Sequence, residues 1–158
     1  MFIEASCFPF TEELQDTWGV IRSEFDSVQH ETIPYLENDL YTGEWDVFPF
    51  LFFEKEYKEN QTKCPQTWEA LQKIPGLVNA SFSILRQATE VEPHTGFTDQ
   101  VLRCHLGLDI PHGCAIIVGN VPKRWQEGKC LIFDDTVEHY AYNKSHEDRG
   151  VLLLDFKK

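Results

Sequence analysis

VLRCHLGL, residues 101–108, alternates apolar side chains with polar or small ones. An alternation with a period of two predicts a β-strand that has one buried face. Arg103, His105 and Gly107 share the other face. In an open sheet this second face would be solvated, whereas in a closed barrel or jelly roll it would line a polar cavity. The stretch alone leaves both interpretations open.

Further short segments of this kind make up the chain from residue 78 onward. The predicted strands cover residues 78–85, 101–108, 114–118, 130–133, 139–143 and 151–156. Turn residues such as Pro111-His112-Gly113 and Gly119-Asn120 separate them. Six or more strands with this spacing predict an antiparallel barrel or a double-sheet jelly roll.

The first half of the chain has a largely helical pattern. Between residue 11 and about residue 29, apolar residues recur at spacings of four and three, which predicts one amphipathic helix with Thr11 as its N-cap. Residues 45–53 form an aromatic strand candidate, and Pro49 within it favours the edge of a sheet. Residues 64–74 predict a second helix. We therefore expect one domain over residues 1–158, with helical support over about 1–75 and a β-core over about 76–158.

Composition and charge narrow the class of protein. The chain has 158 residues, 42% of them hydrophobic, which is enough for one folded domain. Its net charge is −12, so we expect no nucleic-acid partner and no binding to an anionic membrane. The N-terminus is unlike a signal peptide and no apolar run approaches the roughly 20 residues that cross a bilayer, so we expect a cytoplasmic protein. The five scattered cysteines are expected to be free thiols.

Two histidines lie beside predicted strands. His94 stands in the segment PHTG, and His139 follows the apolar strand 130–133 and several acidic residues. Taken alone, each is more often a solvated loop histidine than a ligand. Together with Arg103 and Arg149 on or beside strands of a jelly roll, they indicate a mononuclear metal site built from neutral imidazoles at the mouth of a cavity.

Seven short motifs stand in a fixed order along the second half of the chain. They are FSIL at 82–85, PHTG at 93–96, VLRCHLGL at 101–108, IP at 110–111, WQEGKCLIFDD at 125–135, EH at 138–139 and DR at 148–149. In order and separation these motifs resemble the aspartyl/asparaginyl β-hydroxylases, a family of iron(II)- and 2-oxoglutarate-dependent oxygenases, over about residues 80–156. The resemblance implies a double-stranded β-helix, a cupin-like jelly roll, which agrees with the predicted strands.

The resemblance also implies a metal site. His94 and His139 match the two iron-binding histidines of the family. The wider oxygenase superfamily adds an Asp or Glu two residues after the first histidine, but this chain has Gly96 there, which cannot bind a metal. The resemblance therefore implies Fe(II) with two protein ligands and water in the vacant position. Asp134 and Asp135 are candidates to orient that water or a histidine, with solvated loop acids as the equally weighted alternative.

Four further residues match the co-substrate site of the family. Arg149 and Ser83 match residues that bind the distal carboxylate of 2-oxoglutarate, and Arg103 with His105 match contacts to its keto-acid end. Arginine suits a dicarboxylate, because its planar fork donates two charge-assisted hydrogen bonds where lysine offers a point charge. Fe(II) accepts imidazole and keeps positions for the keto acid and for O₂.

The resemblance implies an enzyme, a dioxygenase that couples decarboxylation of 2-oxoglutarate with O₂ to hydroxylation of a C–H bond, giving succinate and CO₂. We expect a small-molecule or peptide substrate, most directly an aspartyl or asparaginyl residue in a peptide, or a free amino acid. Phe97 stands where the family commonly has proline, and it is expected to narrow the pocket. Two alternatives stay open: a halogenase in which chloride fills the position left by Gly96, and a non-catalytic cupin-like binding or regulatory module.

Overall fold

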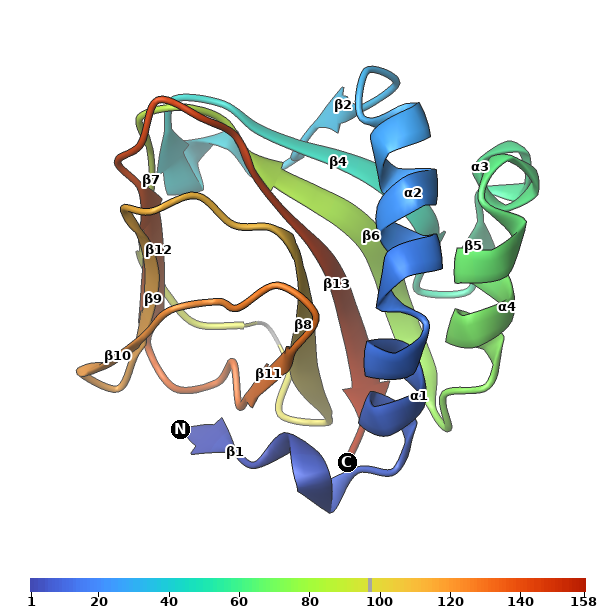
Figure 1. Ribbon diagram of the computed structural model, residues 1–158. Coiled ribbons are helices and arrows are strands. Elements are labelled where there is room, and N and C mark those ends of the chain that lie inside the picture. The colour runs from blue at the N-terminus through green and yellow to red at the C-terminus, as the bar shows by residue number, and fades with distance from the viewer. Residues whose placement is uncertain (97) are drawn as a thin grey trace.

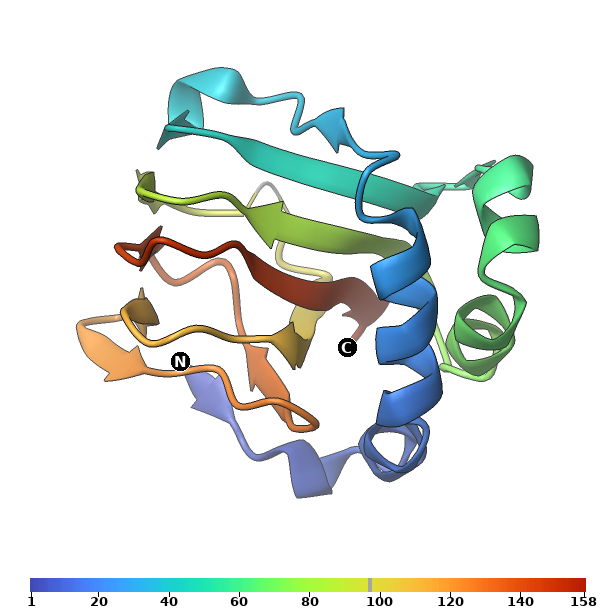
Figure 2. The same ribbon diagram turned by 45° about the horizontal axis from the view of Figure 1, so that its top comes forward.

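Two antiparallel β-sheets face each other, and helices cover the outer face of the larger sheet (Figures 1 and 2). The computed structural model describes residues 1–96 and 98–158. The larger sheet has the order β1 (Phe2–Ile3), β11 (Cys130–Phe133), β8 (Val101–Asp109), β13 (Arg149–Lys157), β6 (Leu77–Leu85), β4 (Trp45–Phe52) and β2 (Ile33–Pro34), and β5 (Lys55–Glu56) pairs with β4. The smaller sheet has the order β10 (Val121–Lys123), β9 (Cys114–Val118), β12 (His139–Asn143), β7 (Thr89–His94) and β3 (Tyr41–Thr42). This arrangement confirms the predicted fold class, a mainly β jelly roll with N-terminal helices.

Where the sequence predicts one N-terminal helix, the structure has two. The helix α1 (Phe10–Asp16) ends at Thr17, and α2 (Trp18–Val28) begins directly after it. The hydroxyl of Thr17 donates to a backbone carbonyl one turn earlier, and such side-chain bonds compete with the helix ladder. The predicted N-cap is also wrong, because Thr11 lies inside α1 and its hydroxyl donates backward to the carbonyl of Phe8.

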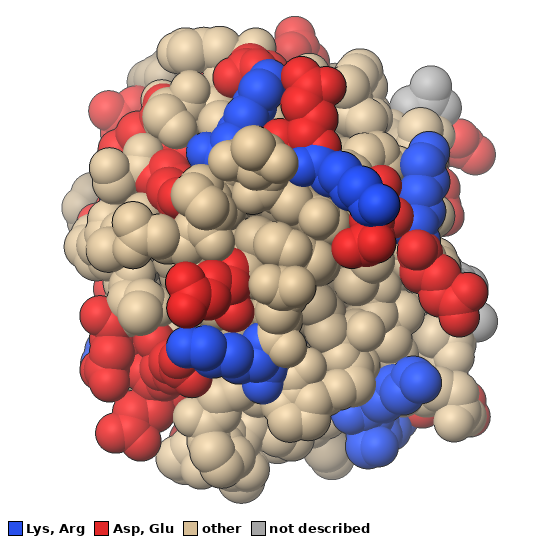
Figure 3. All heavy atoms as spheres, turned by 90° about the vertical axis from the view of Figure 1, so that its right-hand side faces the viewer, with Lys and Arg blue, Asp and Glu red and all other residues tan. Residues whose placement is uncertain are grey.

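Two shorter helices, α3 (Lys58–Lys63) and α4 (Pro65–Gln72), follow β5 and lie beside α2 (Figure 1). Pro65 occupies the first turn of α4, where its missing N–H costs no hydrogen bond. Figure 3 shows the helical side of the molecule, on which Lys and Arg lie interspersed among Asp and Glu. Exposed ion pairs such as Lys73 with Glu13 contribute little to stability, so the helices depend on their buried faces.

Every helix within the described residues is too short or too polar to cross a membrane. The remaining helical segments are two single turns of 3-10 helix, Ala5–Cys7 and Asn38–Leu40.

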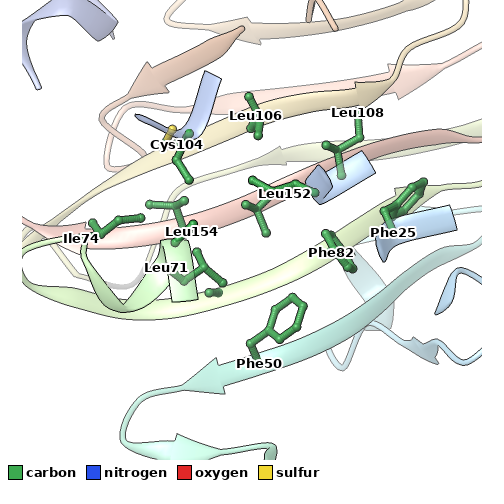
Figure 4. Close-up of a cluster of buried hydrophobic side chains, with 14 of the residues drawn as sticks. Phe25, Phe50, Leu71, Ile74, Phe82, Cys104, Leu106, Leu108, Leu152 and Leu154 are labelled. Atoms are coloured by element: carbon green, nitrogen blue, oxygen red, sulfur yellow. The ribbon is translucent and has the colours of Figure 1, made fainter. Parts of the chain in front are cut away.

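The main core lies between the helices and the outer face of the larger sheet (Figure 4). Phe25 of α2 meets Phe82 of β6 edge to face, with ring centroids 5.2 Å apart, and Phe50 of β4 meets the same ring at 5.1 Å. Cys104 of β8 is buried in this core as a small apolar residue. Since even-numbered residues of β6, β8 and β13 fill this core, the odd-numbered ones point toward the smaller sheet.

This alternation decides the question that the stretch 101–108 leaves open. Arg103 and His105 point into the space between the two sheets and line a pocket there, so their face of β8 is not a solvated one. The cavity interpretation is therefore the correct one. The outer face of the same strand, with its leucines and Cys104, is buried in the main core that the helices cover.

Strand β4 joins the first half of the chain to the larger sheet. It pairs along most of its length with β6, while only the two-residue strands β2 and β5 pair on its other side. The register shifts between Pro49 and Leu51, as expected where a proline cannot donate to the ladder. The predicted aromatic strand near a sheet edge is thus confirmed. The region expected as helical support also supplies five strands, β1 to β5.

Gly150 of β13 lies against the ring of Phe25, and a Cβ at this position would overlap the ring. We expect Gly150→Ala to lower the free energy of unfolding by about 1–3 kcal/mol, because Phe25 is held among other rings and cannot move aside. Gly19→Ala in α2 is the matched control, since no atom lies within 4 Å of a Cβ there, and we expect unchanged or slightly raised stability. Urea unfolding followed by circular dichroism measures both variants, and equal stabilities would contradict the tight Gly150 contact.

Candidate active site

The pocket between the two sheets gathers six of the nine residues predicted from the sequence. These lining residues come from five strands and are Ser83, His94, Arg103, His105, His139 and Arg149. Gly96 lies against Asp135, and the carboxylate of Asp135 is 3.9 Å from the guanidinium of Arg103, which lines the pocket. Asp134 does not reach it. The remaining lining is apolar or aromatic, which is typical of a ligand site with a few placed polar groups.

The two candidate metal ligands face each other across a pair of neighbouring strands. His94 ends β7 and His139 begins β12, and the two residues are register partners in the smaller sheet. Their ring centroids are 4.3 Å apart. The sequence analysis missed β7, although the alternation of buried Thr89 and Val91 with exposed Glu90 is a strand signal. Strand pairing therefore brings together two histidines that are 45 positions apart in the sequence (139 − 94 = 45).

Both imidazoles are held in the orientation that a metal ligand needs. Nδ1 of His94 lies 2.7 Å from the carbonyl oxygen of Glu92, and Nδ1 of His139 lies 2.9 Å from that of Val137. A carbonyl oxygen only accepts, so each Nδ1 carries the proton and donates it. The lone pair is then on Nε2 of each ring, and the backbone carbonyls fix the tautomer.

Burial keeps His139 neutral. Its side chain is buried, and desolvation lowers its pKa to about 4, with smaller contributions from the nearby positive charges. The imidazole therefore stays uncharged well below neutral pH, and an uncharged imidazole is the form that binds metals. Within the described residues, no group of three or more His, Cys, Asp or Glu side chains is placed to hold a metal ion. The pocket thus offers a pair of imidazoles rather than a complete set of protein ligands.

Arg149 is a buried cation without a carboxylate partner among the described residues. It is 2% exposed, its Nη2 donates to the backbone carbonyl and the hydroxyl of Ser83 at 3.2 and 3.3 Å, and its guanidinium lies over the Trp125 ring. Its Nε has no hydrogen-bond partner within the described part of the chain. Desolvation lowers the pKa of Arg149 to about 9, which still leaves it charged at neutral pH. A buried charge without a counter-ion is costly, so the site is suited to an anionic ligand.

His105 presents a second unused donor in the same pocket. Nδ1 of His105 accepts a hydrogen bond from the indole Nε1 of Trp125 at 2.9 Å. The proton of the neutral ring is therefore on Nε2, which is buried and has no partner among the described residues. Burial and the charge of Arg149 hold the pKa of His105 well below its usual value, so the ring stays neutral. Trp125 thus orients both His105 and Arg149, a role that the sequence analysis did not assign.

The second predicted arginine has a different environment. Nε and Nη2 of Arg103 donate to the two carboxylate oxygens of Asp155 at 2.8 and 2.9 Å, and Asn79 donates to the same carboxylate. This bidentate pair raises the pKa of Arg103 and neutralises its charge. Asp155 was missed from the sequence, although it is the one acid in the apolar strand that ends the chain. The predicted contact of Arg103 with 2-oxoglutarate stays a prediction.

The structure separates the two neighbouring acids. Asp134 accepts hydrogen bonds from the backbone and hydroxyl of Thr136 and lies 3.3 Å from the Lys158 ammonium, so it belongs to a surface turn. Asp135 is buried, and one of its carboxylate oxygens has no partner within the described residues. Burial raises the pKa of Asp135. Of the two acids, Asp135 therefore has the environment of a functional group.

The side chain of Asp135 fills the space beside Gly96 that a side chain at position 96 would need. The N–H of Gly96 donates to the backbone carbonyl of Asp135 at 2.7 Å. A Cβ at position 96 would collide with the carboxylate of Asp135, so any side chain there would displace it. The carboxylate of Asp135 therefore lies where a side chain of residue 96 would begin. Phe97, which was expected to narrow the pocket, lies outside the described residues.

Comparisons with known proteins identify the family of this chain. The family model described as Aspartyl/Asparaginyl beta-hydroxylase matches residues 15–158. The chain is 40% identical to an ornithine lipid ester-linked acyl 2-hydroxylase of Rhizobium tropici, covering 98% of this chain and 59% of the relative. It is 36% identical to the human aspartyl/asparaginyl beta-hydroxylase, covering 91% of this chain and 20% of the relative. The chain thus spans less than two thirds of the length of these curated relatives.

Solved structures share the fold at low sequence identity. A non-heme alpha ketoglutarate dependent epimerase from nogalamycin biosynthesis aligns with a TM-score of 0.65 and 13% identity, covering 90% of this chain and 72% of that one. An oxidoreductase of the 2OG-Fe(II) oxygenase family from Burkholderia pseudomallei aligns with a TM-score of 0.62 and 10% identity, covering 85% and 77%. The match of the family model to nearly the whole chain carries the assignment, and this chain belongs to the aspartyl/asparaginyl beta-hydroxylase family.

Proposed function

We propose that this protein is an Fe(II)- and 2-oxoglutarate-dependent dioxygenase that hydroxylates a C–H bond and releases succinate and CO₂. One observation carries the proposal. Arg149 is a buried cation without a carboxylate partner among the described residues, and it shares a pocket with two imidazoles, each of whose Nδ1 atoms is anchored to a backbone carbonyl. A dicarboxylate that also binds a metal satisfies both features at once.

The donor set fits Fe(II). His94 and His139 would hold the ion through Nε2, with Nδ1 of each ring anchored to a backbone carbonyl. Imidazole suits Fe(II), and two protein ligands leave positions for a chelating keto acid and for O₂. When bound, the iron supplies the activation of O₂ for decarboxylation of the co-substrate and oxidation of the substrate. The protein's own part is to bind, orient and desolvate the reactants.

The pocket also fits 2-oxoglutarate. Arg149 and the Ser83 hydroxyl would bind the distal carboxylate, which would provide the counter-charge that Arg149 lacks. The buried Nε2–H of His105 would donate to the keto-acid end. Arg103 would add electrostatic attraction there, reduced by its pair with Asp155. The apolar remainder of the lining excludes water, which strengthens each of these contacts.

Asp135 would take over part of the role of the missing carboxylate ligand. Its carboxylate lies against Gly96, and one of its oxygens has no protein partner among the described residues. It would accept a hydrogen bond from a water that fills the position opposite Gly96, and it would thereby hold that water in place. This arrangement supports hydroxylation over halogenation, because a nearby carboxylate disfavours chloride.

The family assignment does not identify the substrate of this chain. The resemblance points to an aspartyl or asparaginyl residue in a peptide, or to a free amino acid, and this stays a prediction. The Rhizobium tropici relative is named for an ester-linked acyl group of a lipid, whereas the human relative is named for aspartyl and asparaginyl residues. Since the relatives differ in this respect, the substrate class has to be inferred from the cavities of this chain.

Aerobic incubation with Fe(II) and 2-oxoglutarate tests the proposed function directly. Succinate should form, and a substrate drawn from a library of peptides, amino acids and acyl compounds should gain the mass of one oxygen atom. The same product in chloride-free buffer excludes the halogenase alternative. Absence of 2-oxoglutarate binding by the iron-loaded protein would favour the non-catalytic module.

Replacement of either histidine should abolish metal binding, because a site with two protein ligands has no redundancy. We expect His94→Ala and His139→Ala each to lower Fe(II) affinity at least about tenfold to a hundredfold, and to reduce succinate formation to background. Anaerobic titration with Fe(II) measures the affinity. His112→Ala, on an exposed turn, is the control and should bind iron as the wild type does. Wild-type iron affinity in His94→Ala would refute the assignment.

Arg149→Lys should weaken binding of 2-oxoglutarate by roughly tenfold to a hundredfold, because a buried bidentate contact becomes a single charge-assisted bond worth about 1.5–3 kcal/mol less. Isothermal titration of the metal-loaded protein with 2-oxoglutarate measures the change. Arg22→Lys on α2 is the matched control, because its carboxylate partners Asp26 and Asp109 are partly exposed and lie outside the pocket. An unchanged affinity in Arg149→Lys would move the carboxylate clamp to another residue.

The two acids should differ in their effect on turnover. We expect Asp135→Asn to reduce turnover by roughly tenfold to a hundredfold, because a carboxamide removes the charge that orients the water beside the metal. Asp134→Asn is the matched control and should turn over normally, since its carboxylate serves a surface turn. Succinate formation under saturating 2-oxoglutarate compares them. Equal activities of the two variants would exclude a specific role for Asp135.

A further inference from the structure

A second, larger cavity opens on the same inner face of the larger sheet. Its volume is about 150 Å³, and its walls come from β4, β6, β8, β13 and the segment that follows β2. Figure 2 shows β4, β6 and β13 side by side in this sheet. Arg103 and Leu153 line both this cavity, called here the groove, and the metal pocket. The groove therefore adjoins the site of the proposed chemistry at these two residues.

The groove is mainly apolar although the chain as a whole is strongly acidic. Val47, Leu51 and Leu153 line it, and its rim carries exposed apolar residues: Leu36 is 79% exposed, and Ile33 and Phe52 are each 45% exposed. Large apolar side chains are seldom left exposed together around a concavity unless they bind something. In a protein of net charge −12, this concentration marks a binding surface.

The polar groups on the floor of the groove are already paired with one another. Both carboxylate oxygens of Asp155 accept from Arg103, and Asn79 donates to the same carboxylate while its own carbonyl oxygen accepts from the Phe53 N–H. The floor thus carries no net charge at the junction with the metal pocket. A bound peptide backbone would need donors and acceptors that these groups no longer offer.

The junction between groove and metal pocket has an aromatic wall. Tyr35 lines the groove, Trp45 lines the metal pocket, and the two rings stack with centroids 3.8 Å apart. Glu37, Ser81 and Tyr57 add polar atoms to the groove lining, whose remaining surface is apolar. A flexible, uncharged chain can lie along such a surface from the rim to the junction, whereas a free amino acid would leave the groove empty.

We infer that the groove binds the aliphatic acyl chain of an amphipathic substrate and presents one of its C–H bonds at the Arg103 and Leu153 junction. The inference rests on the proposed function, which supplies the reaction. One atom of O₂ enters the C–H bond to give an alcohol, and the other enters succinate. The decarboxylation of 2-oxoglutarate to CO₂ and succinate provides the two electrons that balance the step.

A chain-length series tests the groove without turnover. Neutral N-hexanoyl-, N-octanoyl- and N-decanoylglycinamide are titrated into the metal-free protein by calorimetry. Each CH₂ that enters an apolar groove should tighten binding about fourfold, until the chain exceeds the length of the groove. An affinity that does not depend on chain length, or tighter binding of an apolar peptide, would overturn the inference.

Variants locate the binding site. Val47→Asp places a charge in the groove wall, and Leu36→Asp places one at its exposed rim, where the fold tolerates it. Both should abolish the dependence on chain length. Val20→Asp, on α2 at the opposite face of the sheet, is the matched control and should retain it. Circular dichroism verifies folding, and retention of the dependence in Leu36→Asp and Val47→Asp would overturn the inference.

The inference and the proposed function can fail separately. Binding of 2-oxoglutarate should be unchanged in Val47→Asp and Leu36→Asp, because neither residue lines the metal pocket. If the acyl series binds as expected but the wild type binds no 2-oxoglutarate, the proposed function fails and the groove assignment stands. If 2-oxoglutarate binds and the acyl series does not, the groove assignment fails alone.

Discussion

Packing of the helices against the outer face of the larger sheet is the interaction on which the rest of the structure depends. Phe25 and Phe82 lie at its centre, and the even-numbered residues of three neighbouring strands are buried with them. Side chains alternate strictly along a strand, so a slip by one residue would exchange the two faces. The apolar packing therefore commits Ser83, Arg103 and His105 to the space between the sheets, where they can act on a ligand.

The two arginines between the sheets differ in how their charge is compensated. Asp155 neutralises Arg103, and this pair lies at the boundary where the groove meets the metal pocket. Arg149 is more deeply buried, and among the described residues it donates hydrogen bonds to Ser83 and its guanidinium lies over the Trp125 ring. Burial of this cation costs free energy, and the proposed dicarboxylate would offset that cost. A local unpaired cation of this kind would allow a strongly acidic chain to bind an anion.

The pocket and the groove divide the work of binding between polar and apolar surfaces. Directional groups, namely two oriented imidazoles and buried donors, surround the position proposed for the metal and 2-oxoglutarate. The groove beyond the Arg103 and Asp155 pair offers mainly apolar contact surface, with few groups that would fix the orientation of a ligand. Such a division suits an oxygenase, because the reactive centre must be placed accurately while a substrate chain needs only to be held along its length.

The sequence by itself determined the alternating strands, the jelly-roll class and, through ordered motifs, the family, and it supplied the candidate site residues. It also placed Arg103 and His105 on one face of one strand. Only the tertiary structure decided that this face lines a cavity and that Asp135 rather than Asp134 lies beside Gly96. It also decided that Asp155 neutralises Arg103, whereas Arg149 has no carboxylate partner within the described part of the chain. The physical reason is the separation of the interacting residues along the chain. Alternation is a local property of the sequence. Charge pairing and burial instead depend on residues such as Arg103 and Asp155, which are 52 positions apart and meet only in the folded sheet.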